Sequence, residues 1–183
     1  MPIASSHPEK QARALLSRYR LDQKLPINVE ALTKALGITV KHEPFDEDLS
    51  GVLVKESSHT FIGVNSSHAI TRQRFTIAHE LGHYVLRHKG EVFVDKTLRH
   101  QAAIIRRDGK SSLGQDSYEI QANQFAAELL MPRDLLVARV SKRLGKKSNL
   151  SSDDLVSELA RAFLVSTQAM EYRLTNLGSL ILS

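Results

Sequence analysis

The pentapeptide His79-Glu80-Leu81-Gly82-His83 brings two imidazoles and a carboxylate close together along the chain. On a helix, residues four apart lie on the same face, so the rings of His79 and His83 can converge on one Zn²⁺ ion at roughly 2.0–2.1 Å. Glu80 lies about 100° further round the helix, which suits a carboxylate that takes a proton from the attacking water rather than a metal ligand. The pattern predicts two ligands of a catalytic metal and a general base between them.

The residues around the pentapeptide indicate a helix, because apolar side chains recur near helical spacing at Phe75, Ala78, Leu81, Val85 and Leu86. Chance would produce an H-E-x-x-H pattern roughly 0.02 times in a chain of this composition. The alternative is a core helix whose two histidines are merely hydrogen-bonded. Glycine inside a helix costs about 1 kcal/mol relative to alanine, so we expect Gly82 to mark a close approach by another backbone or a ligand.

A second helix, about residues 116–131, offers a third ligand. Pro132 ends it, since the residue before a proline is biased out of the α region. At 100° per residue, Glu119 and Glu128 lie about 180° apart and cannot face the same metal. Glu119 shares its side with small residues that allow a close approach to the first helix: Ala122, Ala126 and Ala127. We expect Glu119 to be the third ligand, and Asn123 to hydrogen-bond the free ring nitrogen of a ligating histidine.

Composition excludes several classes of protein. The chain of 183 residues has no cysteine, which rules out disulfides, thiol nucleophiles and cysteine zinc sites. No apolar run approaches the ~18 residues that a membrane span needs, and the first residues lack a signal-peptide pattern, so we expect a cytoplasmic protein without membrane contact. A formal net charge of +5 permits nucleic-acid contact, but Lys and Arg are spread along the chain and aromatic residues make up only 5%. A solvated basic surface is therefore favoured over a base-stacking platform.

Other elements are needed to hold these two helices in place. They are expected at the following ranges: helices at 8–19 and 29–36, and strands at 38–42, 51–55 and 60–64. Gly37 suits the left-handed end of the second helix. The short link 56–59 makes the last two strands an antiparallel hairpin. Ser66 or Ser67 is expected to cap the metal helix, which would end near Leu86.

The segment 91–118 is predicted to be the least regular part of the chain. Within it, residues 106–114 combine Arg, Lys, Gly and Ser, as in an exposed basic loop. Such a loop could bind an anionic partner, but it has neither aromatic residues nor a helical stripe. A solvated loop is therefore favoured.

The tail, about residues 149–183, is predicted to form two helices, with Ser151 or Ser152 capping one and Ser166 the other. Two short helices joined near Val165 and Ser166 resemble a helix-turn-helix, so a DNA-binding regulator is the alternative from another class. The second helix offers few side chains that could read bases: Gln168, Arg173 and Asn176. Four basic residues before the tail could contact phosphates or solvate a linker: Lys142, Arg143, Lys146 and Lys147.

Short segments along nearly the whole chain match one known family. They are Leu36-Gly-Ile, Leu49-Ser-Gly51, Ile62-Gly-Val-Asn65, Arg72 to His83, Glu119 to Pro132, Val165-Ser166 and Arg173-Leu174. On these segments the chain resembles the ImmA/IrrE family of bacterial metallo-endopeptidases. The resemblance implies zinc held by His79, His83 and Glu119, with Glu80 as the catalytic base. Two features depart from the family pattern: residues 121 and 123 are Gln and Asn where an acidic residue is often found, and the link from His83 to Glu119 is longer than in compact members.

These observations predict an α+β fold, with a small antiparallel three-stranded sheet packed on a zincin-type helical core and a C-terminal helical lobe. A metallopeptidase domain would occupy residues 1–145, and a helix-turn-helix-like extension residues 146–183. By resemblance, the protein is a Zn²⁺-dependent endopeptidase, with Mn²⁺ also admissible. Its substrate would be an Xre-type helix-turn-helix repressor or an antitoxin, cleaved to derepress stress or mobile-element genes.

The alternative function is a non-catalytic DNA- or repressor-binding regulator, or a toxin–antitoxin component, with a structural metal site. For the enzyme, a group that stabilises the oxyanion is expected beside the metal. By residue type alone, the candidates are Tyr84, His88, His100 and Tyr118.

Overall fold

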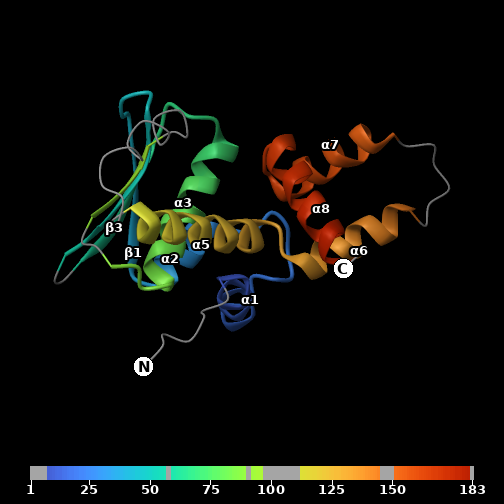
Figure 1. The fold of residues 1–183 in the computed structure, drawn as a ribbon, viewed down its shortest axis with the longest axis horizontal. Coiled ribbons are helices and arrows are strands. Elements are labelled where there is room, and N and C mark those ends of the chain that lie inside the picture. The colour runs from blue at the N-terminus through green and yellow to red at the C-terminus, as the bar shows by residue number, and fades with distance from the viewer. Residues whose placement is uncertain (1–7, 57–58, 90–91, 97–111, 145–150, 182–183) are drawn as a thin grey trace.

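The structure, a computed structural model, describes residues 8–56, 59–89, 92–96, 112–144 and 151–181. Figure 1 shows a sheet and its covering helices at one end and three C-terminal helices at the other, with the long helix α5 (Ser112–Leu130) running between them. The buried apolar side chains form one cluster that includes residues of the sheet, of α5 and of the C-terminal helices.

Four strands form a mixed sheet in the described part of the chain: β1 (Ile38–Glu43), β2 (Leu49–Lys55), β3 (Thr60–Asn65) and β4 (Val92–Lys96). Their spatial order is β1-β3-β2-β4. Strand β3 runs parallel to β1 and antiparallel to β2, and β4 runs antiparallel to β2. The predicted α+β class and the β2–β3 hairpin are confirmed.

The sheet differs from the prediction in two details. Strand β3 lies between β1 and β2, and its pairing with β1 is parallel rather than antiparallel. Consecutive residues of β3, from Ile62 to Asn65, are buried on both faces, which favours a central position. The fourth strand, β4, lies within the segment that was expected to be irregular. Its Val-Phe-Val run has the β-branched and aromatic residues that strands favour, but a run this short, close to Gly90, does not predict a strand.

Helices α2 (Val29–Ala35) and α3 (Ile70–Val85) pack beside the sheet, whereas α1 (Pro8–Arg18) packs against α5. Their ranges agree with the predicted ones, and Gly37 has the expected positive φ of 75°. The predicted serine cap of α3 is wrong, because α3 begins after Ala69 without a side-chain cap. Instead, Asn65 Oδ1 accepts the N–H of Ser67 at 3.0 Å, and the chain makes a turn before the helix starts.

Two glycines let α3 approach its neighbours. A Cβ on Gly51 of β2 would lie 2.3 Å from Thr76 Cγ2, so α3 sits directly on the sheet. A Cβ on Gly82 would lie 3.1 Å from Ala122 Cα and 3.2 Å from Ala122 O, so the backbones of α3 and α5 meet at this point. The expected close approach of another backbone to Gly82 is confirmed.

The helix α6 (Arg133–Leu144) follows α5 and was not predicted. Pro132 ends α5, but its carbonyl also accepts the N–H of Leu136 at 2.9 Å and so begins α6. Helix α5 starts at Ser112, within the segment expected to be a loop. The rest of that segment, residues 97–111, lies outside the described residues.

The tail forms α7 (Ser152–Phe163) and α8 (Thr167–Ile181). Ser151 Oγ accepts the N–H of Asp154, and Ser166 Oγ accepts that of Ala169, each at 3.1 Å, so both predicted caps are confirmed. Lys146 and Lys147 lie outside the described residues, and the division at 145/146 stays a prediction. Among the helices described, we find none with the length and apolar character needed to cross a membrane.

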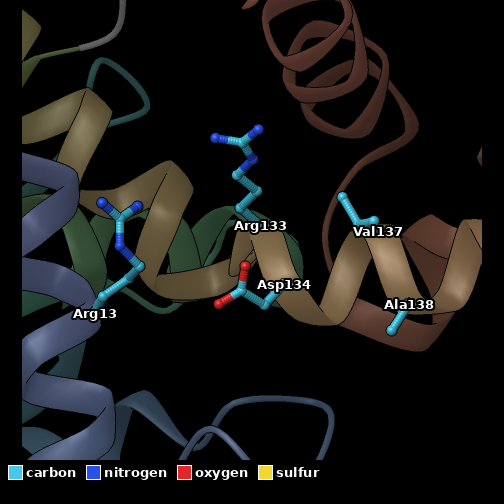
Figure 2. Close-up of a pocket in the computed structure, with 5 residues that line it drawn as sticks. All are labelled: Arg13, Arg133, Asp134, Val137 and Ala138. Carbon is cyan, nitrogen blue, oxygen red and sulfur yellow. The ribbon is translucent and has the colours of Figure 1, made fainter. Parts of the chain in front are cut away.

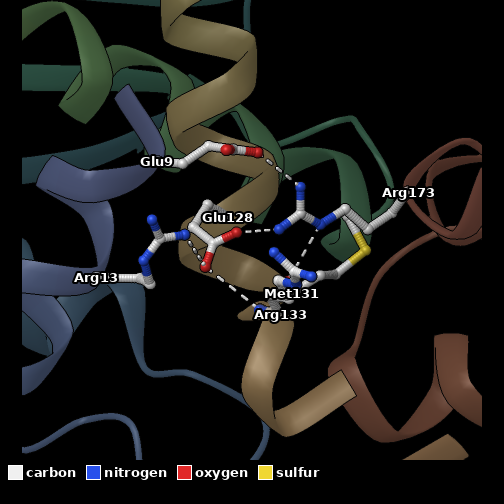
Figure 3. Close-up of polar contacts among 6 residues, drawn as sticks. All are labelled: Glu9, Arg13, Glu128, Met131, Arg133 and Arg173. Atoms are coloured by element: carbon white, nitrogen blue, oxygen red, sulfur yellow. Dashed lines mark hydrogen bonds and ion pairs between the residues drawn. The ribbon is translucent and has the colours of Figure 1, made fainter. Parts of the chain in front are cut away.

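A cluster of charged residues joins α1, α5 and α8 (Figure 3). Arg173 of α8 is 4% exposed, and it pairs with Glu128 and with Glu9, the latter at 3.1 Å. Glu128 also pairs with Arg13 at 3.2 Å. Arg173 was a candidate for reading DNA bases; its guanidinium is instead buried between two carboxylates. Of the three candidates, only Gln168 and Asn176 are exposed.

Candidate metal centre

Helices α3 and α5 bring three ligand atoms together. The Nε2 atoms of His79 and His83 lie 3.1 Å apart, although both rings are buried. Glu119 of α5 faces them, with one carboxylate oxygen 3.1 Å from His79 Nε2 and the other 3.3 Å from His83 Nε2. These three residues each offer an atom to a group in which all ligand atoms lie within 4.8 Å of one another. The structure thus assembles the three residues that were predicted to bind the metal.

The second ring nitrogen of each histidine has its own partner. His79 Nδ1 lies 2.9 Å from Asn123 Oδ1, which can only accept, so the Nδ1–H of His79 donates. His83 Nδ1 lies 3.0 Å from His88 Nδ1. These contacts hold both rings with Nε2 facing the Glu119 carboxylate. Two converging imidazole nitrogens and a carboxylate are the donor set that suits a divalent cation such as Zn²⁺.

The charges of these groups also fit a cation. Burial lowers the pKa of His83, even though its hydrogen bond to Glu119 raises it. Burial raises the pKa of Glu119, but the hydrogen bonds from His79 and His83 act more strongly in sum and bring it well below its usual range. At neutral pH the His83 imidazole is neutral and the Glu119 carboxylate ionised. Metal binding requires these protonation states.

Glu80 lies on α3 between the two histidines and is 1% exposed. A cation stands near it: burial lowers the pKa of Lys55, and the Glu80 carboxylate raises it. Lys55 Nζ also donates to the carbonyl of His88 at 3.2 Å. Lys55 had not been predicted as a site residue, because a lysine at the end of a strand is ordinarily solvated and gives no signal in the sequence.

The four oxyanion candidates have different positions. His88 stacks on Tyr118, with ring centroids 4.3 Å apart and an interplanar angle of 13°. Burial lowers the pKa of His88 to about 4, so its ring is neutral. Tyr84 packs against the hydrophobic core, and His100 lies outside the described residues. Both nitrogens of His88 are engaged, one by His83 and one by Gln121, which favours a supporting position over contact with a substrate.

An open pocket lies between α1 and α6 (Figure 2). Its lining residues are Arg13, Arg133, Asp134, Val137 and Ala138. No residue of the metal centre lines it, and Arg13 is already paired with Glu128. The pocket is therefore separate from the chemistry described above.

Comparison with known proteins identifies one family. The family model Peptidase_M78, described as the IrrE N-terminal-like domain, matches residues 33–175, well over half of the chain. The matched range contains every residue of the metal centre and most of the C-terminal helices. No curated protein matches the chain.

Proposed function

We propose that this chain, which belongs to the Peptidase_M78 family of IrrE N-terminal-like domains, is a metal-dependent endopeptidase. The observation that carries the proposal is the convergence of two buried Nε2 atoms and one carboxylate, with a buried glutamate between the two histidines. Three protein ligands leave the fourth position of a tetrahedral ion open. Catalytic zinc sites share this arrangement, whereas structural sites are closed.

His79, His83 and Glu119 would hold Zn²⁺, with Mn²⁺ as a second admissible ion. A divalent ion held there would polarise the scissile carbonyl and lower the pKa of a water molecule. Glu80 accepts a proton from the attacking water and delivers it to the leaving amine. The ammonium of Lys55 lies near the Glu80 carboxylate and attracts it electrostatically.

The family resemblance supports a protein substrate, either an Xre-type helix-turn-helix repressor or an antitoxin. Its cleavage would derepress stress or mobile-element genes. The alternative function, a non-catalytic DNA-binding regulator, has less support. Of its three candidate base-reading side chains, Arg173 is buried in ion pairs.

Replacement of the general base tests the proposal. Glu80→Gln keeps the shape of the side chain but cannot accept the proton, so cleavage of a repressor encoded beside this gene should fall by about 10²–10⁴-fold. Metal content should stay at the parent level. The measurement is the rate of repressor cleavage by gel, with and without a chelator, alongside metal analysis of both proteins.

Glu30→Gln is the matched control, because this α2 carboxylate is largely exposed and distant in sequence from the centre. It should cleave as the parent does. If Glu80→Gln cleaves the repressor or relieves repression as well as the parent, the chain acts by binding and the peptidase proposal fails.

A further inference from the structure

We propose that His88 is a positioning residue for the metal ligand His83, because its ring accepts the Nδ1–H of His83 and thereby aims His83 Nε2 at the metal. This inference rests on the proposed function, since it requires His83 to be a ligand. His88 itself stands behind His83, on the Nδ1 side of that ring, and contacts neither the metal nor the substrate.

The hydrogen-bond donors and acceptors determine the direction of this contact. The two Nδ1 atoms are 3.0 Å apart, so one must carry a proton and the other must accept it. His88 Nε2 faces Gln121 Oε1 at 3.5 Å, a long contact in which the amide oxygen can only accept. The orientation of that amide follows from its other end, where Gln121 Nε2 donates to Ser117 Oγ at 3.0 Å. His88 therefore carries its proton on Nε2 and offers Nδ1 as the acceptor for His83.

The end of α3 is folded so that His88 returns to His83. Arg87 has a left-handed φ of 56°, where glycine is usual, and the chain reverses there. The N–H of His88 donates to the carbonyl of His83 at 3.1 Å, and the N–H of Arg87 to that of Tyr84 at 3.2 Å, which is the Schellman pattern. The Schellman motif usually brings an apolar residue against the helix at this point. Here it brings an imidazole against a metal ligand.

Two further elements fix the ring and backbone of His88. Lys55 at the end of β2 donates to its carbonyl at 3.2 Å, and Tyr118 of α5 stacks on its ring at 4.3 Å. His88 is 5% exposed as a result. By contrast, His79 is oriented by Asn123, which is exposed. The two ligand rings thus have different hydrogen-bond partners. Among the contacts described, only His83 has a second buried imidazole as its partner.

The test compares two replacements of similar size. Asn and Leu have nearly the same shape, and both remove the stacking on Tyr118, but only His88→Asn places an acceptor oxygen near the Nδ1 position. His88→Leu should weaken Zn²⁺ binding by about 10–100-fold, the usual effect of losing the partner of a ligating histidine. His88→Asn should stay within about threefold of the parent. Affinity is measured by competition with a chromogenic chelator, with thermal unfolding of the metal-free proteins and His42→Leu as controls for folding and for loss of a histidine elsewhere.

A second measurement uses the unaltered protein loaded with Zn²⁺. Nitrogen-15 NMR of the histidine rings should find His88 Nδ1 unprotonated and Nε2 protonated, with a scalar coupling between the Nδ1 atoms of His83 and His88 across the hydrogen bond. A proton on His88 Nδ1 overturns the inference, as does equal Zn²⁺ affinity in parent and His88→Leu. A parent chain that binds no Zn²⁺ overturns the proposed function as well, so the two failures are distinguishable.

Discussion

Glu119 and Glu128 stand on the same helix but in unrelated surroundings. Glu119 meets the two histidine Nε2 atoms, whereas Glu128 is buried against Arg173 and Arg13 on the other side of α5. The half-turn between them, expected from helical geometry, separates a ligand candidate from a group that stabilises the fold.

Replacing each glutamate with glutamine separates these two environments. Glu119→Gln removes the anionic ligand. Loss of a residue that only hydrogen-bonds a ligand typically weakens metal binding by about 10–100-fold, and Glu119→Gln should weaken Zn²⁺ binding by more than that. Glu128→Gln should keep the full metal content, because its side chain points away from the centre. Metal analysis after purification, followed by chelator competition, measures both; equal loss in the two variants would show that Glu119 is not a ligand.

At this scale the sequence is informative wherever helical geometry alone sets a position. It brings His79, His83 and Glu119 to one place and puts Asn123 beside a ligand ring, as the structure has them. It could not indicate Lys55 or the place of His88. Lys55 lies at the end of a strand, far in sequence from the two helices that hold the other residues. His88 contacts His83 because Arg87 has a left-handed φ, and an arginine does not indicate that conformation in a sequence.

Among the elements, the contact between α3 and α5 determines whether the candidate ligands meet. Gly82 allows this contact, because its α-carbon faces the backbone of Ala122. Glu119 lies one turn before Ala122 on the same helix, so the separation of the two helices also sets the distance from Glu119 to the histidines.

Gly82→Ala should therefore destabilise the protein and weaken metal binding. Alanine gains about 1 kcal/mol in helix propensity, but a methyl group 3.1 Å from Ala122 Cα overpacks the contact, which typically costs about 1–3 kcal/mol. Gly178→Ala in α8 is the control. Its Cβ would meet nothing within 4 Å, so only the propensity gain remains and stability should rise. Urea denaturation measures both; a stabilised Gly82→Ala variant with parental metal affinity would contradict the close-contact account.

The elements that the sequence failed to predict lie where two signals overlap. Pro132 was taken only as the end of α5, although a proline also suits the start of a helix, and α6 begins there. The parallel pairing of β1 with β3 could not be predicted, because a hairpin fixes only the pairing of its own two strands. The hairpin and the helix caps at Ser151 and Ser166 depend on local chemistry and were predicted correctly.

At the scale of the whole molecule, the charged cluster around Arg173 is the main polar link between α8 and the earlier helices in the part of the chain that the structure describes. It joins α8 to α5 through Glu128 and to α1 through Glu9. Arg173 Nε also donates to the carbonyl of Met131 at 3.3 Å, at the junction of α5 and α6. A pairing over 164 residues leaves no local pattern, so the sequence suggested Arg173 as a candidate for reading DNA bases and not as a partner of Glu9.

Arg173→Met tests this link. The substitution removes the buried cation that pairs with the Glu128 carboxylate. Removing one partner of a buried ion pair typically lowers the free energy of unfolding by about 3–5 kcal/mol. The double variant Glu128→Gln with Arg173→Met also removes the unpaired carboxylate charge, so it should recover part of that loss. The single and the double variant should both bind metal as the parent does. Chemical denaturation gives the free energies of unfolding. A loss below about 1 kcal/mol in Arg173→Met would mean that the cluster contributes little.

The order in which a ribosome makes the chain gives this cluster another consequence. Glu9 is translated first, Glu128 much later, and Arg173 close to the end of the described residues. While the nascent chain still lacks Arg173, the carboxylate of Glu128 has no buried cation from α8, and α5 lacks one of the contacts that stabilise its packing at that end. The helix that carries Glu119 therefore reaches its final stability only after α8 has been translated.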